Sequence, residues 1–255
     1  MKSMLIAFAM YSKLPVPHTD WDKKSLSWAL CWFPLVGLVI GALLYGWLRL
    51  AQALDLGPLL RGAIALLLPI AASGAIHLDG FCDTCDALGS HQDRARKLEI
   101  LKDTHTGAFA IICCGLYLIV FFAAWCEVLP TGRTALVLAL GPALSRSLSG
   151  LAAVSWPNAR GSGLLATFTA PMHAKRARIL LLGWTLLCAA SMLLLDPFTG
   201  TAAVLAAGLS FGYYAALSHR QFGGITGDLA GFFLQINACA MVLAVALAQK
   251  IGVLL

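Results

Sequence analysis

Residues 108–129, AFAIICCGLYLIVFFAAWCEVL, decide the fold, because Glu127 is the only charged residue in this stretch. A helix of this length rises about 33 Å, enough to cross the ~30 Å hydrocarbon layer of a bilayer. Over the whole chain of 255 residues, 60% are hydrophobic and 12% are charged. This composition excludes an ordinary soluble domain and predicts an integral membrane protein.

Working outward from this stretch, six further stretches are long and apolar enough to form transmembrane helices. They cover residues 28–50, 58–78, 134–155, 177–195, 199–218 and 229–249. Residues 4–11 are apolar but too short to span, and the lysines around them favour an interfacial helix over a cleaved signal peptide. We therefore predict an all-α, polytopic membrane protein with about seven transmembrane helices, forming a single domain over residues 1–255.

The distribution of lysine and arginine predicts the orientation of the protein. Thirteen of these eighteen residues fall in segments on one side of the predicted spans and four on the other, while Arg146 lies within a span. Basic segments usually stay in the cytoplasm. The N-terminus and residues 77–107, 156–178 and 219–228 are therefore expected on the cytoplasmic side of a plasma (inner) membrane. The net charge of +6 has the same origin and does not indicate nucleic-acid binding.

Residues 77–107, HLDGFCDTCDALGSHQDRARKLEILKDTHTG, contain six of the twelve acidic residues. Asp79, Asp83 and Asp86 have i, i+4, i+7 spacing, which places their carboxylates within about 60° of one another around a helix. At an effective dielectric of 20 and a separation of about 6 Å, two carboxylates repel by roughly 3 kcal/mol. A hard divalent cation such as Mg²⁺, or a base such as Lys102, would offset this repulsion. The alternative is a solvated acidic loop.

Other residues of the same segment allow two interpretations each. Glu99 and Asp103 form a second acidic pair beside Lys102, which could meet a phosphate oxygen, but salt bridges along a helix surface explain the pair equally well. Cys82 and Cys85 form a C-x-x-C motif between the aspartates. Because no second C-x-x-C follows, we interpret both cysteines as packing residues and not as zinc ligands. The other cysteines lie within spans and indicate no disulfide framework.

Arg146 lies near the middle of the predicted span 134–155. An arginine there costs about 2.5–3.5 kcal/mol on insertion scales, so we expect it to meet an acidic residue or a phosphate. Snorkelling to the interface is the alternative. His77 and His105 bracket the acidic segment and are interpreted, from the pattern alone, as ordinary loop or interface residues.

Residues 223–228, GGITGD, lead into the last predicted span. Their glycines let backbone amides approach an anion, and Asp228 can cap the following helix or bind a cation. An ordinary loop with a helix N-cap explains an isolated motif of this kind as well. Here the motif is predicted on the same side of the membrane as the acidic segment, which favours a shared site.

Five motifs together resemble one known family. They are SKLPVP at 12–17, FPLVGLVIG at 33–41, H-x-D-G-x-x-D-x-x-D at 77–86, L-E-I-L-K-D-T-H-x-G at 98–107 and G-G-I-T-G-D at 223–228. The combination covers nearly the whole chain in order and resembles the cobalamin synthase (adenosylcobinamide-GDP ribazoletransferase) family. The resemblance implies a magnesium-dependent transferase of cobalamin biosynthesis that joins adenosylcobinamide-GDP to α-ribazole, or its 5′-phosphate, and releases GMP. This is the final assembly step of the nucleotide loop.

The resemblance also implies roles for individual residues. The expected metal ligands are Asp79, Asp83, Asp86 and Asp103; the expected catalytic residues are Asp83, Asp86 and Lys102; and the expected substrate-binding residues are Arg146, His105, Gly224, Thr226 and Asp228. The chain departs from the family pattern at Ala87, where a glycine is usual, and at Thr104 and His105, where the pattern continues K-D-S with arginine. A homo-oligomer and association with other cobalamin-assembly enzymes are both left open.

Two other classes of membrane protein also use acidic residues. CDP-alcohol phosphotransferases bind magnesium through helix aspartates, but their pattern has Ala-Arg soon after Asp-Gly, where this chain has Phe81, Cys82 and Asp83. A cation-coupled transporter would hold acids near mid-membrane and show symmetry between its halves. Here the acids lie at a predicted loop and no internal repeat is evident.

Overall fold

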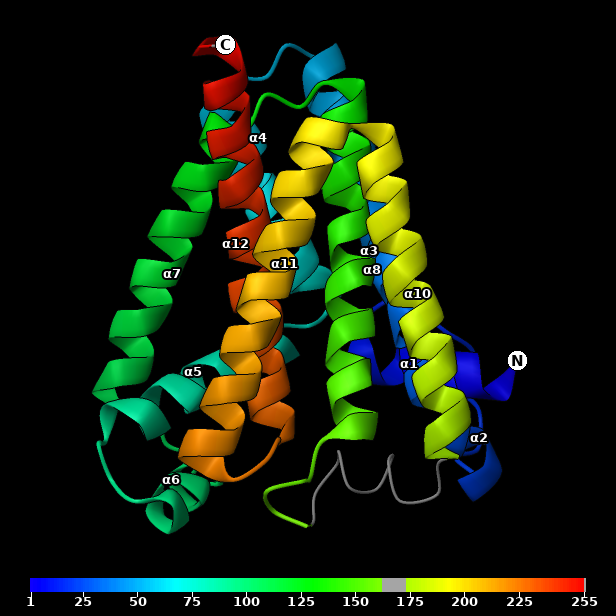
Figure 1. Cartoon of the computed structure of the whole chain (residues 1–255), viewed down its shortest axis with the longest axis vertical. Coiled ribbons are helices and arrows are strands. Elements are labelled where there is room, and N and C mark those ends of the chain that lie inside the picture. Colours follow the sequence, from blue (N-terminus) through cyan, green and yellow to red (C-terminus); the bar gives the residue numbers. More distant parts are fainter. Residues whose placement is uncertain (162–172, 255) are drawn as a thin grey trace.

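The computed structural model describes residues 1–161 and 173–254, and its elements are helices. In chain order they are α1 (Lys2–Tyr11), α2 (Lys23–Ala29), η1 (Leu30–Trp32), α3 (Phe33–Ala53), α4 (Pro58–Ala72), α5 (Ile76–Gly89), α6 (Arg94–Ile100), α7 (Ala108–Glu127), α8 (Gly132–Ser155), α10 (Ala174–Leu195), α11 (Pro197–Leu217), η2 (Ser218–Phe222) and α12 (Gly227–Leu254). The long helices form an elongated bundle, with α5 and α6 near one end and the C-terminus at the other (Figure 1).

Six helical stretches in the described part of the chain are long and apolar enough to cross a membrane. They are Lys23–Ala53, Ala108–Glu127, Gly132–Ser155, Ala174–Leu195, Pro197–Phe222 and Gly227–Gly252. Each coincides with one of the predicted spans, so the predicted all-α, polytopic fold is confirmed. The short helix predicted near residues 4–11 is α1, which is too short to span.

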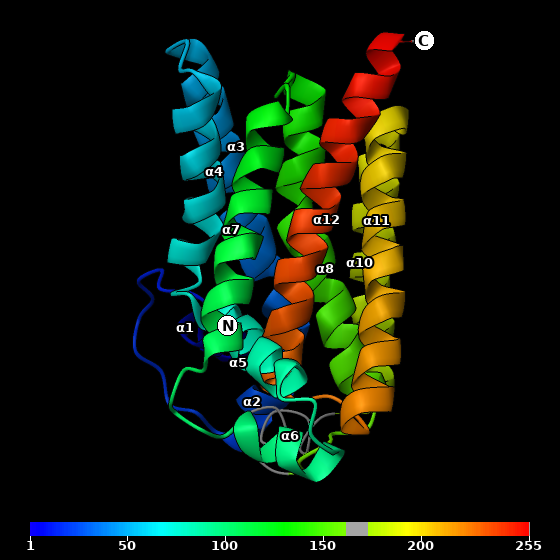
Figure 2. The ribbon, with the colours of Figure 1, turned by 90° about the vertical axis from the view of Figure 1, so that its left-hand side faces the viewer.

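The predicted span at residues 58–78 differs, because the chain bends by 93° between α4 and α5. Gly74 and Ala75 both have left-handed backbone conformations at this bend. The amide of Ala75 donates to the carbonyl of Ile70 (2.9 Å), and that of Gly74 donates to Ala71 (3.0 Å). These two bonds form a Schellman motif, which ends α4. Counting the bent pair as one span gives seven spans, but α5 itself lies across the end of the bundle (Figure 2).

The central helix of the bundle is α8. Of its most apolar 18 residues, 78% are buried, against 17% in the peripheral helix α10. Helix α3 approaches α8 closely at Gly37 and Gly41, where an added Cβ would overlap the backbone of Pro142 and Ala139. Small residues four apart are a usual way for membrane helices to pack. Large apolar side chains are exposed on the outer helices, as expected for a surface in contact with lipid: Ile111, Leu116, Ile119, Ile179, Leu186 and Leu209.

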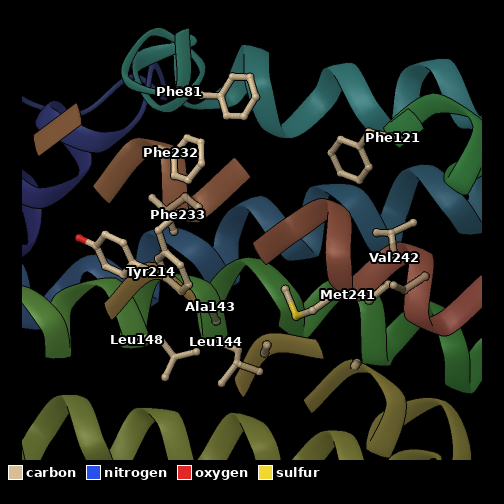
Figure 3. Close-up of a cluster of buried hydrophobic side chains, with 14 of the residues drawn as sticks. Phe81, Phe121, Ala143, Leu144, Leu148, Tyr214, Phe232, Phe233, Met241 and Val242 are labelled. Carbon is tan, nitrogen blue, oxygen red and sulfur yellow. The ribbon is translucent and has the colours of Figure 1, made fainter. Parts of the chain in front are cut away.

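The last helix, α12, is fixed inside the bundle by aromatic and polar contacts. Phe233 stacks on Tyr214 of α11 with ring centroids 4.8 Å apart, and both belong to the buried cluster drawn in Figure 3. Asn237 donates to Ser210 of α11 (2.7 Å) and accepts a hydrogen bond from Ser145 of α8 (2.5 Å). Such bonds hold helices together where the surroundings are apolar. They fix the start of α12, which carries Asp228, relative to the rest of the bundle.

Candidate active site

Two loops from distant parts of the sequence pair at the end of the bundle where α5 lies. The amide of Ala159 donates to the carbonyl of Ile225, and the amide of Ile225 donates to Pro157, both at 2.9 Å. A Cβ at Gly224 would lie 3.0 Å from the Ala159 nitrogen, so this approach requires a glycine. The pairing holds Arg160 close to the start of α12.

Helix α5 crosses the start of α12 at two glycines. A Cβ on Gly80 would lie 2.8 Å from the Asp228 Cα, and a Cβ on Gly231 would lie 2.8 Å from the His77 carbonyl. Phe81 adds a stacking contact with Phe232 of α12 at 5.5 Å between centroids, and the two rings face each other in Figure 3. The predicted helical placement of the aspartate stripe is confirmed, and the stripe lies beside Asp228.

The carboxylates at this crossing repel one another. Burial and the neighbouring carboxylates raise the pKa of Asp83, a half-buried side chain outside the membrane-spanning helices, to about 6. Those carboxylates belong to Asp79, Asp228 and Asp86, in decreasing order of effect. Arg160 opposes this shift, and its Nη2 lies 3.0 Å from Asp228 Oδ2. Negative charge exceeds positive charge in this cluster, which favours binding of a cation.

Asp86 points to the start of α7. Its Oδ2 accepts a hydrogen bond from the amide of Gly107 (2.6 Å), and its Oδ1 accepts one from Ala110 (2.8 Å). These amides belong to the first turn of α7, where backbone donors lack partners within the helix and the helix dipole favours negative charge. Asp86 therefore caps α7. Its metal-binding and catalytic roles stay predictions, and each of its oxygens already accepts one bond.

Thr226 and Gly224, both predicted to bind substrate, have structural contacts in the site. Thr226 is the N-cap of α12, because its Oγ1 accepts a hydrogen bond from the amide of Leu229 (3.2 Å). The same hydroxyl lies 3.4 Å from Asp228 Oδ2 and orients that carboxylate. Gly224 permits the loop pairing described above. Their predicted contacts with substrate stay predictions.

Three predicted site residues lie apart from the α5 aspartates, in the exposed loop between α6 and α7. They are Lys102, Asp103 and His105. Asp103 Oδ1 accepts a hydrogen bond from the backbone amide of His105 (3.0 Å). The same oxygen lies 2.7 Å from Nδ1 of the His105 ring. These bonds lower the pKa of Asp103. In the described ranges, no hydrogen bond or ion pair links Lys102 or Asp103 to the α5 aspartates. Glu99 instead pairs with Arg96 on the exposed face of α6 (2.7 Å), as the surface salt-bridge alternative predicts.

Arg146 is buried in the bundle and does not reach the interface. Its Nη1 donates to the Pro142 carbonyl (3.2 Å), and its guanidinium lies 5.5 Å from the centre of the Phe33 ring. The ring of His77 contacts the same phenylalanine, with centroids 5.9 Å apart. Arg146 Nε and His77 Nε2 are both buried without a hydrogen-bond partner in the described structure. Arg146 therefore belongs to a buried cluster behind the carboxylates.

A cavity of about 190 Å³ opens beside the carboxylates. Its lining includes Tyr11, Phe33, His77, Asp79, Arg160 and Asp228. A smaller cavity of about 70 Å³ lies deeper in the bundle and is lined by Arg146, Gln235 and again His77. Polar groups thus surround the outer part of the larger cavity, while aromatic rings line its inner part.

Sequence reasoning missed two residues of this site. Arg160 lies in the segment WPNARG, where the Asn158 side chain accepts hydrogen bonds from the amides of Arg160 (2.9 Å) and Gly161 (3.1 Å). The Pro-Asn and Arg-Gly pairs could have indicated this turn, but not its partner. His77 was interpreted as an ordinary residue, although it is buried and lines both cavities. Residues 162–172 of the segment 156–178, predicted on the cytoplasmic side, lie outside the described residues.

No group of three His, Cys, Asp or Glu side chains within residues 1–161 and 173–254 is arranged to hold a metal ion. Fewer protein ligands are sufficient for a magnesium ion that keeps waters and binds substrate phosphates. The site is thus a set of carboxylates and one arginine at the mouth of a cavity.

An apolar helical bundle with carboxylates and an arginine gathered at one end defines an integral membrane protein with a polar site near the membrane surface. The family model of cobalamin-5-phosphate synthase matches residues 3–246, and the chain belongs to this family. The family predicted from the five motifs is therefore confirmed.

Individual relatives are similar over almost the whole chain. A protein of Lachnoclostridium phytofermentans is 41% identical over 251 residues, which are 98% of this chain and 95% of that protein. A protein of Pseudomonas aeruginosa is 34% identical over 97% of this chain and 98% of its own length, and one of Clostridium botulinum is 29% identical over 92% and 93%. All three are named adenosylcobinamide-GDP ribazoletransferase. No solved structure matches the chain.

Proposed function

We propose that this protein is a membrane-bound adenosylcobinamide-GDP ribazoletransferase. It would join adenosylcobinamide-GDP to α-ribazole, or to its 5′-phosphate, and give adenosylcobalamin, or its 5′-phosphate, and GMP. The observation that carries this proposal is a cavity lined by Asp79, Asp228 and Arg160. Asp83 is not part of this lining, but it lies close enough to Asp79 and Asp228 for their charges to act on it. The relatives' names and the family membership supply the substrates.

The carboxylates suit magnesium as the cofactor. Asp79, Asp83 and Asp228 offer hard oxygen ligands, and burial together with the neighbouring carboxylates raises the pKa of Asp83. Magnesium usually takes one or two carboxylates and completes its shell with water and phosphate oxygens. When bound, the ion would neutralise charge on the pyrophosphate of the substrate. Asp86 and Asp103 are further proposed ligands, although both already accept hydrogen bonds from protein groups.

The residues of the chain support a phosphoryl transfer. A hydroxyl oxygen of α-ribazole forms a bond to the cobinamide-linked phosphorus, the bond from that phosphorus to the bridging oxygen breaks, and its electron pair leaves with GMP. The hydroxyl proton passes to a carboxylate, and Asp83, with a pKa of about 6, has a basicity suited to that role. Arg160 at the mouth of the cavity, and Lys102 in the exposed loop between α6 and α7, would offset phosphate charge.

The proposed location is the plasma (inner) membrane, with the active site facing the cytoplasm. Segments rich in lysine and arginine, including α2 and α6, gather at the same end of the bundle as α5 (Figures 1 and 2). This end should stay in the cytoplasm, where charged corrinoid and nucleotide substrates are dissolved. Whether the protein forms a homo-oligomer, or associates with other cobalamin-assembly enzymes, is a separate question.

The test supplies membranes that contain the protein with adenosylcobinamide-GDP, α-ribazole and magnesium, and follows the products by chromatography. Equal amounts of cobalamin and GMP are expected, and EDTA should abolish both. Asp83→Asn should abolish them too, whereas Glu99→Gln, on the exposed face of α6, serves as the control. Absence of product from folded wild-type protein, or wild-type activity in both Asp79→Ala and Asp83→Ala, would overturn the proposal.

A further inference from the structure

The larger cavity extends inward from the carboxylates along α12. Its lining on this helix begins at Gly227 and continues to Leu234, a rise of about 10 Å at 1.5 Å per residue. On α8 it includes Ser149 and Ala153, which precede the loop that carries Arg160. We call the part between Phe33 and Leu234 the inner chamber. The cavity as a whole, at about 190 Å³, has room for a flat group of two fused rings.

Three rings from separate elements form one wall of the inner chamber. The rings of Tyr11 in α1 and Phe33 in α3 lie 4.3 Å apart between centroids, with 39° between their planes. His77 in α5 meets Phe33 edge-on, at 5.9 Å and 61°. Aromatic walls of this kind favour a flat aromatic ligand, because stacked and edge-on ring contacts are both attractive.

One polar atom in this wall lacks a partner. His77 is 8% exposed, and its Nε2 has no hydrogen-bond partner within the described structure. A buried polar atom normally has a partner, because losing water without a replacement destabilises the protein. A neutral imidazole nitrogen can donate or accept one bond, depending on the tautomer. The inner chamber therefore combines an apolar aromatic surface with a lining residue, His77, that has one unused hydrogen-bonding position.

We propose that the inner chamber binds a flat, fused-ring heteroaromatic base through Phe33 and Tyr11, with one hydrogen bond from His77 Nε2 to a ring nitrogen. This inference rests on the proposed function and assigns the chamber to the base of α-ribazole. An N-glycosylated benzimidazole has one free ring nitrogen and otherwise apolar edges. Guanine, the other base in the reaction, has several donors and acceptors that apolar walls would leave without partners. Bound base-first, α-ribazole would place its ribose near Asp79 and Asp228.

The first experiment measures substrate preference in the full-length protein in membranes. Wild type should use α-ribazole about ten-fold better, in kcat/KM, than an indole analogue with a CH group in place of the free ring nitrogen. His77→Phe should raise KM for α-ribazole about ten-fold, leave KM for adenosylcobinamide-GDP within about two-fold, and remove this preference. His77→Gln keeps a donor and should restore part of the preference, which a merely structural role of His77 would not explain.

A pair of matched variants tests the aromatic wall. Phe33 and Phe121 are both buried, at 3% and 4% exposure, but Phe121 lines only the deeper cavity. Phe33→Leu should weaken use of α-ribazole selectively, whereas Phe121→Leu should leave the ratio of the two KM values unchanged. Selective weakening by Phe121→Leu and not by Phe33→Leu would overturn the assignment.

A binding measurement on wild type covers the case in which these variants fail to fold. Free 5,6-dimethylbenzimidazole should compete with α-ribazole in equilibrium dialysis and should not displace adenosylcobinamide-GDP. Competition with adenosylcobinamide-GDP alone would assign the chamber to the other substrate and overturn the inference. If wild type turns over both substrates but shows no preference for the ring nitrogen, only this inference fails. If it forms no GMP at all, the proposed function fails.

Discussion

The two halves of the acidic segment, residues 77–89 and 94–107, contain three and two acidic residues, but only the second half also contains lysine and arginine, and the two halves have different surroundings. The first half is α5, which packs against α12 and α7 and brings its aspartates beside Asp228 and Arg160. The second half is α6 and an exposed loop, in which Glu99 and Asp103 pair with their own neighbours. Crowded aspartates in sequence therefore become a shared site only where the helix that carries them is packed into the bundle.

The difference arises from the residues between the charges. In α5, Gly80, Phe81, Cys85 and Ala87 are buried, which leaves the acidic side chains along the edge of a packed helix. In α6, the buried residue with a polar contact is Lys97, whose Nζ donates to Gln221 of η2 (2.5 Å). Helix α6 thus contacts the bundle through Lys97 and the partly buried Leu98 and Ile100, and exposes its acids to solvent. Variants in the two halves should have correspondingly different effects.

The largest difference is expected between Asp83→Asn and Glu99→Gln. Asp83→Asn removes both the negative charge and the proposed proton acceptor from the carboxylate cluster, and should lower kcat/KM by roughly 10³-fold or more. Glu99→Gln breaks an exposed pair with Arg96, worth at most about 1 kcal/mol, and should leave activity within about two-fold. Product formation per milligram of folded protein measures both. Equal effects of the two substitutions would contradict the distinction between the halves.

A second prediction concerns the contact between α5 and α12. Gly80→Ala places a methyl group 2.8 Å from the Asp228 backbone, so the helices must separate, at a cost of about 1–3 kcal/mol. Activity should fall about 10- to 100-fold, because the carboxylates move apart. Gly115→Ala in α7 is the matched control, since no atom lies within 4 Å of the added Cβ. Thermal unfolding in detergent and activity assays test the pair, and a normal Tm and activity in Gly80→Ala would refute the close contact.

Asp86→Ala tests the cap of α7. Loss of its bonds to the amides of Gly107 and Ala110 should cost about 0.5–2 kcal/mol of stability. Asp103→Ala, in the exposed loop, should leave Tm unchanged. Unfolding of both variants in the same detergent provides the comparison. If Asp86→Ala lost activity with an unchanged Tm, Asp86 would be a ligand of the reaction and not a cap.

Lys102→Gln tests whether the exposed half of the acidic segment, residues 94–107, takes part in the reaction. Lys102 is exposed, and its ammonium group forms no hydrogen bond or ion pair within the described residues, so the substitution should leave Tm unchanged. If its ammonium group binds substrate phosphate, kcat/KM should fall about ten-fold, a charge interaction worth about 1.4 kcal/mol. Lys102→Arg should retain most of the activity. Wild-type kinetics in Lys102→Gln would exclude the predicted catalytic role.

The smallest expected effect is the change of thermal stability with pH in the absence of metal. The folded-state pKa of Asp83 is about 6, above the usual 3.8, so protonation of this group favours the folded state. In EDTA, Tm should therefore rise slightly as pH falls from 7 to 5, and the contribution is lost as pH rises through about 6. The difference in this trend between wild type and Asp83→Asn isolates the contribution of Asp83. Identical trends in the two proteins would show that the pKa of Asp83 is not raised in the folded protein.

The spanning helices could be predicted because an apolar run of about twenty residues is visible without any knowledge of its neighbours. The bend at Gly74 could not, because residues 58–78 form one continuous apolar run and the Schellman motif is a property of the backbone. The turn also changes the position of α5, which lies across the bundle and does not continue the axis of α4. Hydropathy thus predicts which segments are buried in the membrane but not their direction.

The site could be predicted in part. The i, i+4, i+7 spacing predicted a shared stripe, and the charge distribution placed Asp228 on the same side. The ion pair of Arg160 with Asp228 depends on pairing between residues 157–160 and 224–226, which are far apart in the sequence. The capping role of Asp86 depends on the position of α7. Both are contacts between distant segments, and no local pattern specifies them.

The pairing of the loop after α8 with the loop before α12 also has a consequence for biogenesis. The acidic helix α5 emerges from the ribosome early, whereas Asp228 and the glycine face that covers α5 are synthesised with the final helix. The candidate active site is therefore completed only when α12 inserts into the bilayer. In a nascent chain whose last helix has not inserted, the surface of α5 that faces α12 would stay uncovered. Membrane quality-control proteases can recognise such a surface before the protein consumes any corrinoid.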